Sequence, residues 1–483
     1  MRNLKVLIIN PPIRLNDKPR NIPHGLAILA NMIRKKAGIN PKFIDINAHR
    51  YSNEQVQSIL RSVEFDVVLI GGLIPVYKRI ILYADMIKSI NPNAVIIAGG
   101  SAAMSVPYLM LNNSKVDVIC AGEGERAVVD LLNGLKENHL KELTHVKGFY
   151  FKVDGRISYS GNHDLLGDLD SESDLPAYDL LPMDIYLSNP VVGIGRDTDF
   201  ISSRGCPFNC TFCYQPWGRK FRAHSVSFIM DAFRHLKDNY NIDFISFQDD
   251  EFMADKIRVK EFCEQRNRYF PDLLWSCTGR ANIVSRDEDI IKLMKDSGCT
   301  LISCGFESGS QRMLDRMHKT QTIEEMEKTV RIFRKYKLPV PASFIIGMPG
   351  EDKESCRETI DFCLRNKISL DSLMFATPYP GSEIFDFALK TKRINADNPH
   401  EFIMRIEDAR DFIINLTDSF SDEELIKARE DAMRLTKENY NRFITMDETM
   451  TKMRALFGPV MSRAGFDEKD LEHRMKHGGM CNF

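Results

Sequence analysis

Three cysteines in the middle of the chain have the type and spacing of ligands for a metal cluster. Cys206, Cys210 and Cys213 form the pattern C-x3-C-x2-C within eight residues. Soft thiolate ligands suit iron–sulfur clusters, and three such thiolates can hold three irons of one [4Fe–4S] cluster. Because no fourth cysteine lies nearby in the sequence, the fourth iron keeps an open position, as a catalytic metal centre does. We therefore predict a catalytic cluster at these residues.

Two simpler interpretations compete with the cluster: a structural zinc site completed by a remote ligand such as His224, and three unrelated core thiols. Zinc sites usually pair two C-x2-C units across a longer loop, whereas this triplet is continuous and follows a predicted strand. The cluster is therefore the favoured interpretation. The other cysteines have no comparable spacing, and we expect them to pack in the core: Cys120, Cys263, Cys277, Cys299, Cys304, Cys356, Cys363 and Cys481.

The element that must position the triplet is a repeated strand–helix unit. Apolar runs recur roughly every thirty residues, separated by stretches with apolar residues at helical spacing. These runs centre near Phe200, Ile245, Leu274, Ile302, Phe344 and Leu373. Six such units predict a partial (β/α)6 barrel over 196–390, and such repeats carry their chemistry on the loops after the strands. The triplet lies after the first of these strands.

An earlier part of the chain, 1–140, predicts a second α/β unit. Five short apolar runs alternate with helical patterns, which is typical of a flavodoxin-like, doubly wound parallel sheet. Ligands bind such sheets at the carboxyl ends of the strands. The residues that follow the strands, and could therefore bind a ligand, are Asn10, Pro11, Pro12, Gly71, Gly72, Gly99, Gly100, Gly122, Glu123, Gly124 and Glu125.

The remaining segments have weaker patterns. We expect 141–195 to be a connector with a small hairpin near 149–157, because Gly, Ser and Asp cluster there without sustained periodicity. The charged, helical pattern of 391–483 predicts a helical extension.

Composition excludes several classes of protein. The 483 residues are 43% hydrophobic and 27% charged, with a net charge of -2, so no basic surface for a nucleic acid is expected. No uninterrupted apolar run approaches the ~18 residues that span a bilayer. We therefore expect a cytoplasmic protein with reduced thiols, no transmembrane segment and no nucleic-acid partner.

With Phe212 as the aromatic residue, the triplet reads C-x3-C-x-aromatic-C and resembles the signature of the radical S-adenosylmethionine (radical SAM) superfamily. The resemblance implies that the open iron binds S-adenosylmethionine. One electron from a donor such as flavodoxin or ferredoxin then cleaves it to a 5′-deoxyadenosyl radical, which abstracts a substrate hydrogen.

Four later segments extend the resemblance to the subgroup that includes the tRNA methylthiotransferases and cobalamin-dependent members: 247–252, 305–310, 344–351 and 378–382. The resemblance implies that Asp249 and Asp250 contact the methionine amino group or the substrate. Arg280 would offer a guanidinium fork to a carboxylate. Glu307 and Ser308 would lie near the ribose or the methionyl end. An ion-pair network lining the barrel is the alternative for Asp249, Arg280 and Glu307.

Two further residues are implied in adenine binding. Gly347 and Pro349 belong to a Gly-Met-Pro-Gly segment whose glycines let the backbone approach the adenine closely. Plain turn chemistry is the alternative for this segment.

The 1–135 segment resembles the cobalamin-binding domain that precedes many radical SAM barrels, which implies that its strand-end residues contact cobalamin. The Asp-x-His-x-x-Gly loop of the cobalamin mutases does not follow Ile9 here. This departure removes the histidine that would ligate cobalt, and a flavodoxin-like domain without the corrinoid is the alternative.

The leading functional prediction is cobalamin-dependent methylation of an unactivated carbon in a small molecule, lipid or peptide. Radical cyclisation or rearrangement without methyl transfer is an alternative. Methylthiotransfer is disfavoured because that group carries three more cysteines in its amino-terminal domain, whereas only Cys120 precedes residue 200 here. A non-catalytic corrinoid- or zinc-binding module is the remaining alternative.

Overall fold

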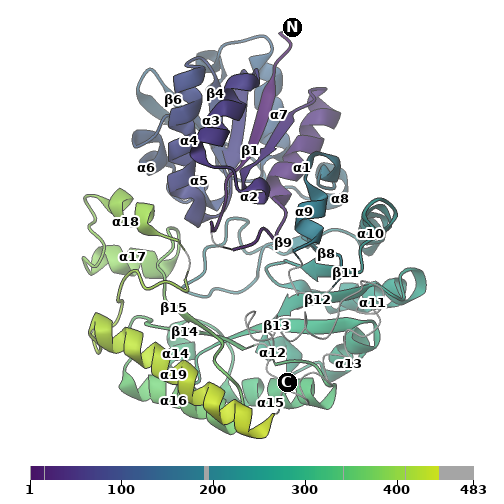
Figure 1. The fold of residues 1–483 in the computed structure, drawn as a ribbon, viewed down its shortest axis with the longest axis vertical. Helices are drawn as coiled ribbons and strands as arrows, with labels where there is room; N and C mark the ends of the chain where they lie inside the picture. The colour runs from purple at the N-terminus through teal and green to yellow at the C-terminus, as the bar shows by residue number, and fades with distance from the viewer. Residues whose placement is uncertain (1, 16, 190–194, 341, 408, 445–483) are drawn as a thin grey trace.

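The computed structural model describes residues 2–15, 17–189, 195–340, 342–407 and 409–444. Two β-sheets, each covered by helices, lie one above the other in Figure 1, with α17 and α18 beside both. No helix in these ranges is long and apolar enough to cross a membrane.

The first sheet has seven strands in the order β2-β1-β3-β4-β5-β6-β7. Their bounds are β1 (Val6–Asn10), β2 (Lys42–Asp45), β3 (Val67–Gly71), β4 (Val95–Gly99), β5 (Val118–Cys120), β6 (Phe149–Val153) and β7 (Arg156–Tyr159). The helices are α1 (His24–Met32), α2 (Ile46–His49), α3 (Asn53–Ser62), α4 (Tyr77–Ile90), α5 (Ser101–Met104), α6 (Pro107–Asn112) and α7 (Gly124–Leu135). Strands β1 to β5 are parallel, as predicted.

Strand β1 shows why these runs are apolar throughout. All five of its residues are buried. Leu7 and Ile9 join the core on one face of the sheet, whereas Val6 and Ile8 join the core on the other. A parallel strand covered on both faces has no solvent-facing positions, so period-two alternation is lost. Each such side chain stabilises the fold by about 1.5–3 kcal/mol.

The hairpin expected near 149–157 is confirmed as β6 and β7, but it is not a free part of a connector. Strand β6 pairs antiparallel with β5, and Phe149 and Phe151 are fully buried against the sheet. The sheet therefore extends two strands beyond the five expected. The rest of the segment holds, among its described residues, the short helices α8 (Leu169–Glu172) and α9 (Met183–Leu187) and the 3-10 turns Leu140–Leu143 and Tyr178–Leu180.

The second sheet has six parallel strands in the order β15-β14-β13-β12-β11-β8. Their bounds are β8 (Asp197–Phe200), β11 (Phe244–Phe247), β12 (Leu274–Gly279), β13 (Cys299–Glu307), β14 (Ala342–Ile346) and β15 (Ser372–Phe375). No pairing joins β8 to β15 in the described chain, so the barrel is open, as the partial (β/α)6 prediction required. A short ribbon, β9 (Ser203–Arg204) with β10 (Arg222–Ala223), follows β8.

The helices of the second unit are α10 (Val226–Tyr240), α11 (Lys256–Tyr269), α12 (Ala281–Val284), α13 (Glu288–Asp296), α14 (Gln311–Arg316), α15 (Ile323–Lys335) and α16 (Lys353–Arg365). Five of them, α10, α11, α13, α15 and α16, occur between the strands where helical patterns predict them, and the short helices α12 and α14 were not predicted. Helix α17 (Glu383–Lys390) ends the predicted barrel range, and the described part of the predicted extension holds the helices α18 (Pro399–Arg405) and α19 (Asp422–Phe443). Residues 445–483 of that prediction lie outside the described residues.

The extension connects the two units. The Tyr77 hydroxyl on α4 lies 3.0 Å from His400 Nδ1 on α18. Helix α19 lies along α16 on the outer side of the barrel (Figure 1). One hydrophobic core runs from the first sheet through Met317 and Met348 of the barrel to Phe385 and Phe402 of α17 and α18. The two sheets are therefore packed into one body.

Candidate functional site

The cysteine triplet lies on a loop that is pinned from two sides. The Thr211 amide donates to the Met317 carbonyl at 3.0 Å, and the Ile384 amide donates to the Thr211 carbonyl at 3.2 Å. Gly205 opens the loop with φ +82, where an added Cβ would collide with the Lys220 carbonyl. Only glycine fits this position without strain. The loop is therefore held in a defined shape by the barrel and by α17.

The three thiols are free and lie near one another. Cys206 and Cys210 are half-buried, and Cys213 has more exposed surface. Enclosure within the loop, together with the neighbouring Cys210 thiol, raises the pKa of Cys213 to about 12. Metal binding replaces the proton on each such thiol, because the thiolate is the ligand.

The donor chemistry fits an iron–sulfur cluster. Three free cysteine thiols offer soft sulfur ligands, and a cubane cluster takes each thiolate on a different iron. His224, the remote zinc ligand considered above, places Nδ1 at 2.9 Å from the Asp170 carboxylate.

Arg280 reaches the cysteine loop from the end of β12. Its Nη1 donates to Cys210 Sγ at 3.4 Å, and its guanidinium lies 3.8 Å from the centre of the Phe208 ring. The second terminal nitrogen of Arg280, Nη2, donates to the Lys319 carbonyl. A buried cation at this place stabilises negative charge on the sulfurs. The predicted contact between Arg280 and a carboxylate remains a prediction.

The acidic segment after β11 meets the strand that leads into the loop. Asp249 is 2% exposed and accepts from the Ser202 amide at 2.6 Å and from the Ser203 hydroxyl at 2.7 Å. The Asp250 carboxylate accepts from the Gly205 amide at 3.2 Å, and burial raises the pKa of Asp250. Both carboxylates therefore fix the backbone that leads into the cysteine loop. Their contact with S-adenosylmethionine remains a prediction.

Two residues of this region escaped the sequence analysis. Burial raises the pKa of Glu251 to about 7. Lys319 is buried, pairs with Glu307 at 2.6 Å and lies 5.9 Å from the centre of the Phe212 ring. Glu251 directly follows the predicted Asp pair, which is a signal that could have found it. Lys319 lies in a turn with no motif around it.

Glu307 is held in an unusual backbone conformation. Its φ is +64, in the left-handed region, and the pairing of β13 with β14 shifts register between Gly305 and Glu307. Such a bulge re-aims a side chain at a strand end. The sequence predicted Glu307 as a site residue, and the structure brings it together with Lys319.

The other predicted residues of the barrel take part in turns and packing. The Ser308 hydroxyl lies 3.2 Å from Thr359 Oγ1 and accepts from the Ser310 amide. Gly347 has φ +91, and its amide donates to the buried Glu351 carboxylate. Pro349 lies in the same turn. These contacts match the turn chemistry that was the alternative for this segment.

The strand ends of the first sheet approach each other through glycines. An added Cβ at Gly71 would lie 2.7 Å from the Gly99 carbonyl oxygen, and one at Gly100 would lie 2.6 Å from that of Gly72. Pro11 and Pro12, after β1, are buried. Asn10 donates to the Asp45 carboxylate at 2.8 Å. Gly122 has open space where a side chain would stand.

Glu123 and Glu125, at the start of α7, contact arginines of the second unit. Glu123 accepts from Arg204 at 2.8 Å and from Arg222 at 2.8 Å, and Glu125 accepts from Arg204 at 2.5 Å. Arg204 stands two residues before Cys206. The strand-end loops of the two sheets therefore meet. The predicted contact of these carboxylates with cobalamin remains a prediction.

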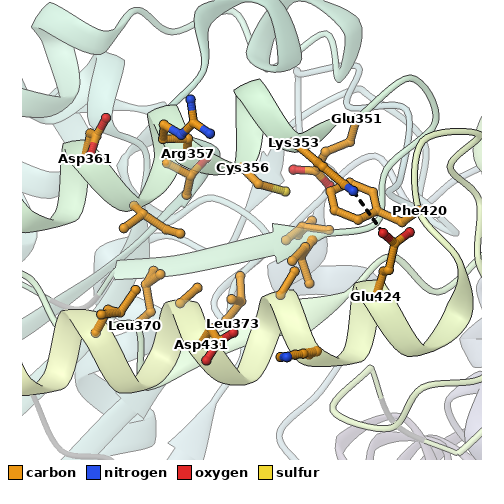
Figure 2. A pocket seen from close by; sticks show the side chains of 18 of the residues that line it. Glu351, Lys353, Cys356, Arg357, Asp361, Leu370, Leu373, Phe420, Glu424 and Asp431 are labelled. Atoms are coloured by element: carbon orange, nitrogen blue, oxygen red, sulfur yellow. Dashed lines mark hydrogen bonds and ion pairs between the residues drawn. The ribbon is translucent and has the colours of Figure 1, made fainter.

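A separate cavity of 660 Å³ lies between α16 and α19 on the outer side of β14 and β15 (Figure 2). Apolar side chains such as Leu370 and Leu373 line it, and the Lys353–Glu424 ion pair spans its rim at 2.9 Å. No residue of the predicted site lines this cavity.

Comparison with known proteins agrees with this arrangement. The Radical SAM superfamily model matches residues 200–363, and the B12 binding domain model matches residues 13–132. An uncharacterized methyltransferase of Pyrococcus horikoshii is 31% identical over 80% of this chain and 84% of its own length. The anaerobic magnesium-protoporphyrin IX monomethyl ester cyclase of Rubrivivax gelatinosus is 24% identical over 75% of this chain and 65% of its own length.

Among solved structures, the radical S-adenosylmethionine methyltransferase TsrM from Kitasatospora setae, with cobalamin and a [4Fe-4S] cluster bound, superposes with a TM-score of 0.68. The match covers 93% of this chain and 90% of TsrM at 15% identity, so it concerns the fold. By its two domain matches and its similarity to the Pyrococcus protein, the chain belongs to the radical SAM superfamily, among the members that carry a B12-binding domain ahead of the barrel.

Proposed function

We propose that this enzyme methylates an unactivated carbon of a small molecule, lipid or peptide in a cobalamin-dependent radical reaction. Membership of the radical SAM superfamily brings the [4Fe–4S] cluster and S-adenosylmethionine, and the B12-binding domain brings cobalamin. The observation that supports the proposal most strongly is the contact between Glu123, in the loop after β5, and Arg204, which precedes the cysteine loop. Two cofactors bound at these loops would face one another.

We assign the cluster to Cys206, Cys210 and Cys213. When bound, the cluster and S-adenosylmethionine supply hydrogen abstraction, and cobalamin supplies a methyl carrier. The protein orients these groups and excludes water. Arg280 contributes a buried positive charge beside Cys210.

The proposed S-adenosylmethionine site lies inside the open barrel. Asp250, Arg280 and the Glu307–Lys319 pair offer opposite charges to the amino and carboxylate groups of the methionine end. The other residues that we place at this site are Phe212, Asp249, Ser308, Gly347 and Pro349.

We place the corrinoid over the strand ends of the first sheet. Small residues there allow a large planar ligand to approach the backbone. The residues proposed to contact it are Asn10, Pro11, Pro12, Gly71, Gly72, Gly99, Gly100, Gly122 and Gly124, with Glu123 and Glu125 at the same loop. We divide the chain into a cobalamin-binding unit over 1–140, a connector over 141–195, the barrel over 196–390 and a helical region over 391–483. An electron donor of the flavodoxin or ferredoxin class would reduce the cluster.

The first test measures the cofactors. Protein purified anaerobically with hydroxocobalamin and reconstituted with iron and sulfide should hold about four irons, together with cobalt, and should release 5′-deoxyadenosine after reduction. Cys206→Ala should abolish nucleoside release because it removes one cluster ligand. The half-buried Cys356 of α16 provides the control, and Cys356→Ala should keep iron, cobalt and nucleoside release. Four irons without cobalt would keep the radical chemistry and refute the cobalamin-dependent mechanism.

A second candidate is cyclisation without methyl transfer, which the similarity to the Rubrivivax cyclase favours. Methyl transfer from S-adenosylmethionine leaves S-adenosylhomocysteine, whereas hydrogen abstraction alone does not. Formation of S-adenosylhomocysteine by the reduced, cobalt-loaded enzyme supports methylation, and its absence during substrate turnover supports cyclisation.

A further inference from the structure

We infer that four buried charged residues, Glu123, Glu125, Arg204 and Arg222, position the cysteine loop relative to the corrinoid-binding face of the first sheet. We call them the junction cluster. This inference rests on the proposed function, because it assigns the two cofactors to the two sides of the junction cluster. In this role its members are positioning residues, and the role is separate from the cobalamin contact proposed above for Glu123 and Glu125.

Arg204 makes the direct connection between the units. Its Nη1 donates to Glu123 at 2.8 Å and its Nη2 donates to Glu125 at 2.5 Å, so one guanidinium binds two carboxylates of the loop after β5. Its guanidinium also lies 5.6 Å from the centre of the Trp217 ring. A planar fork with two anchored partners has little rotational freedom.

Arg222 joins the connector segment to the same carboxylate, Glu123. Its Nη1 donates to both oxygens of Glu123, at 2.9 and 2.8 Å, and to the Leu166 carbonyl at 2.8 Å. Glu123 in turn accepts from the Leu166 amide at 2.7 Å. Ser173 donates to Glu125 at 3.3 Å. Three separate parts of the chain therefore converge on two carboxylates.

Burial and charge balance make the junction cluster difficult to open. Its four side chains are at most 9% exposed, and its two positive and two negative charges cancel. Although burial opposes ionisation, the Arg222 and Arg204 guanidiniums hold the pKa of Glu123 below its usual value. Removing one charge would leave the junction cluster with an uncompensated buried charge, which is strongly unfavourable.

The path from the junction cluster to the cysteines is short and stiff. Arg204 pairs with Arg222 across the β9–β10 ribbon, and only Gly205 separates it from Cys206. Gly205 is itself fixed, because its amide donates to Asp250 and the Lys220 carbonyl leaves no room for a side chain at this position. A displacement of Glu125 and the loop after β5 would therefore be transmitted to the cysteines that we assign to the iron–sulfur cluster.

The test uses Glu125→Gln, which keeps the shape of the side chain and removes its charge, and Arg204→Lys, which keeps the charge and removes the fork. Arg34→Gln is the control. Arg34 also joins the first unit to the connector, through an ion pair with Asp179 at 3.0 Å, but that pair is exposed.

The first measurement is amide hydrogen exchange over 203–213 in the reconstituted full-length protein. Loss of a charge-assisted hydrogen bond should speed exchange there by about tenfold or more in Glu125→Gln and leave it unchanged in Arg34→Gln. The second is the magnetic coupling between the reduced cluster and cob(II)alamin, which depends on their separation. The magnetic coupling should shift or disappear in Glu125→Gln and in Arg204→Lys, and it should stay the same in Arg34→Gln.

The outcomes separate the two proposals. Unchanged exchange over 203–213 in Glu125→Gln, or unchanged magnetic coupling in variants that hold both cofactors, overturns the positioning role. Wild-type protein without cobalt refutes the proposed function, and the exchange measurement then still decides whether the junction cluster holds the cysteine loop.

Discussion

At the residue scale, Glu351 is a buried carboxyl group whose protonation is coupled to folding. It is 2% exposed and accepts from the Gly347 and Met348 amides. Burial raises its pKa from 4.5 to about 7. Between these two pH values the folded protein keeps a proton that the unfolded chain has lost. Its contribution to stability therefore falls as the pH rises from about 4.5 to about 7.

Replacing Glu351 should flatten this dependence. Glu351→Gln cannot titrate, so the change in unfolding free energy between pH 5 and pH 7 should differ from that of the wild type by about 1–3 kcal/mol. Urea unfolding followed by circular dichroism at the two pH values measures it. Glu354→Gln, an exposed carboxyl group in α16, should behave as the wild type. If the unfolding free energy of Glu351→Gln depended on pH as that of the wild type does, the assignment of a raised pKa to Glu351 would be contradicted.

At the element scale, the ends of β3 and β4 meet through glycine. Gly100 has φ +72, and an added Cβ would lie 2.6 Å from the Gly72 carbonyl oxygen. A larger residue must therefore separate the two strand ends over which we place the corrinoid. Gly25, near the start of α1, has no atom within 4 Å of an added Cβ.

These two glycines give a matched pair of variants. Gly100→Ala should lower the free energy of unfolding by about 1–3 kcal/mol, because it adds backbone strain and a steric clash. It should also reduce cobalt retention. Gly25→Ala should keep the wild-type stability or raise it slightly, because alanine favours a helix. Thermal unfolding and cobalt analysis measure both effects. Wild-type behaviour of Gly100→Ala would show that the strand ends tolerate separation.

At the scale of the whole molecule, Asp199 of β8 connects the barrel to the segment that leads into α1. It accepts from the Ile22 amide at 3.1 Å and from Asn21 at 3.2 Å, and it lies 3.3 Å from His24 Nε2. Asp199 and His24 are buried. Together with the junction cluster and the shared hydrophobic core, this contact should make the two sheets unfold together.

Asp199→Asn should weaken that cooperation. It removes the charge opposite His24 and one acceptor, and we expect a loss of about 1–3 kcal/mol. We also expect a broader or two-step denaturation curve in place of a single transition, measured by calorimetry. Asp184→Asn, whose side chain is 96% exposed beside Arg196, should unfold as the wild type. A single, unshifted transition in Asp199→Asn would mean that the other contacts between the two sheets are enough to make them unfold together.

The sequence by itself determined the features that local patterns encode. The C-x3-C-x2-C spacing indicated a cluster, the apolar runs indicated five plus six parallel strands, and helical spacing indicated the covering helices. These predictions succeed because residue type and period depend on near neighbours along the chain.

Only the tertiary structure decided which distant residues meet. Glu123 and Arg204 are 81 positions apart, and no period relates them. The same holds for the Glu307–Lys319 pair, where Lys319 carries no motif, and for Phe149 and Phe151, whose burial depends on pairing with β5. Buried charges need partners, and the fold supplies them from segments that the sequence keeps apart.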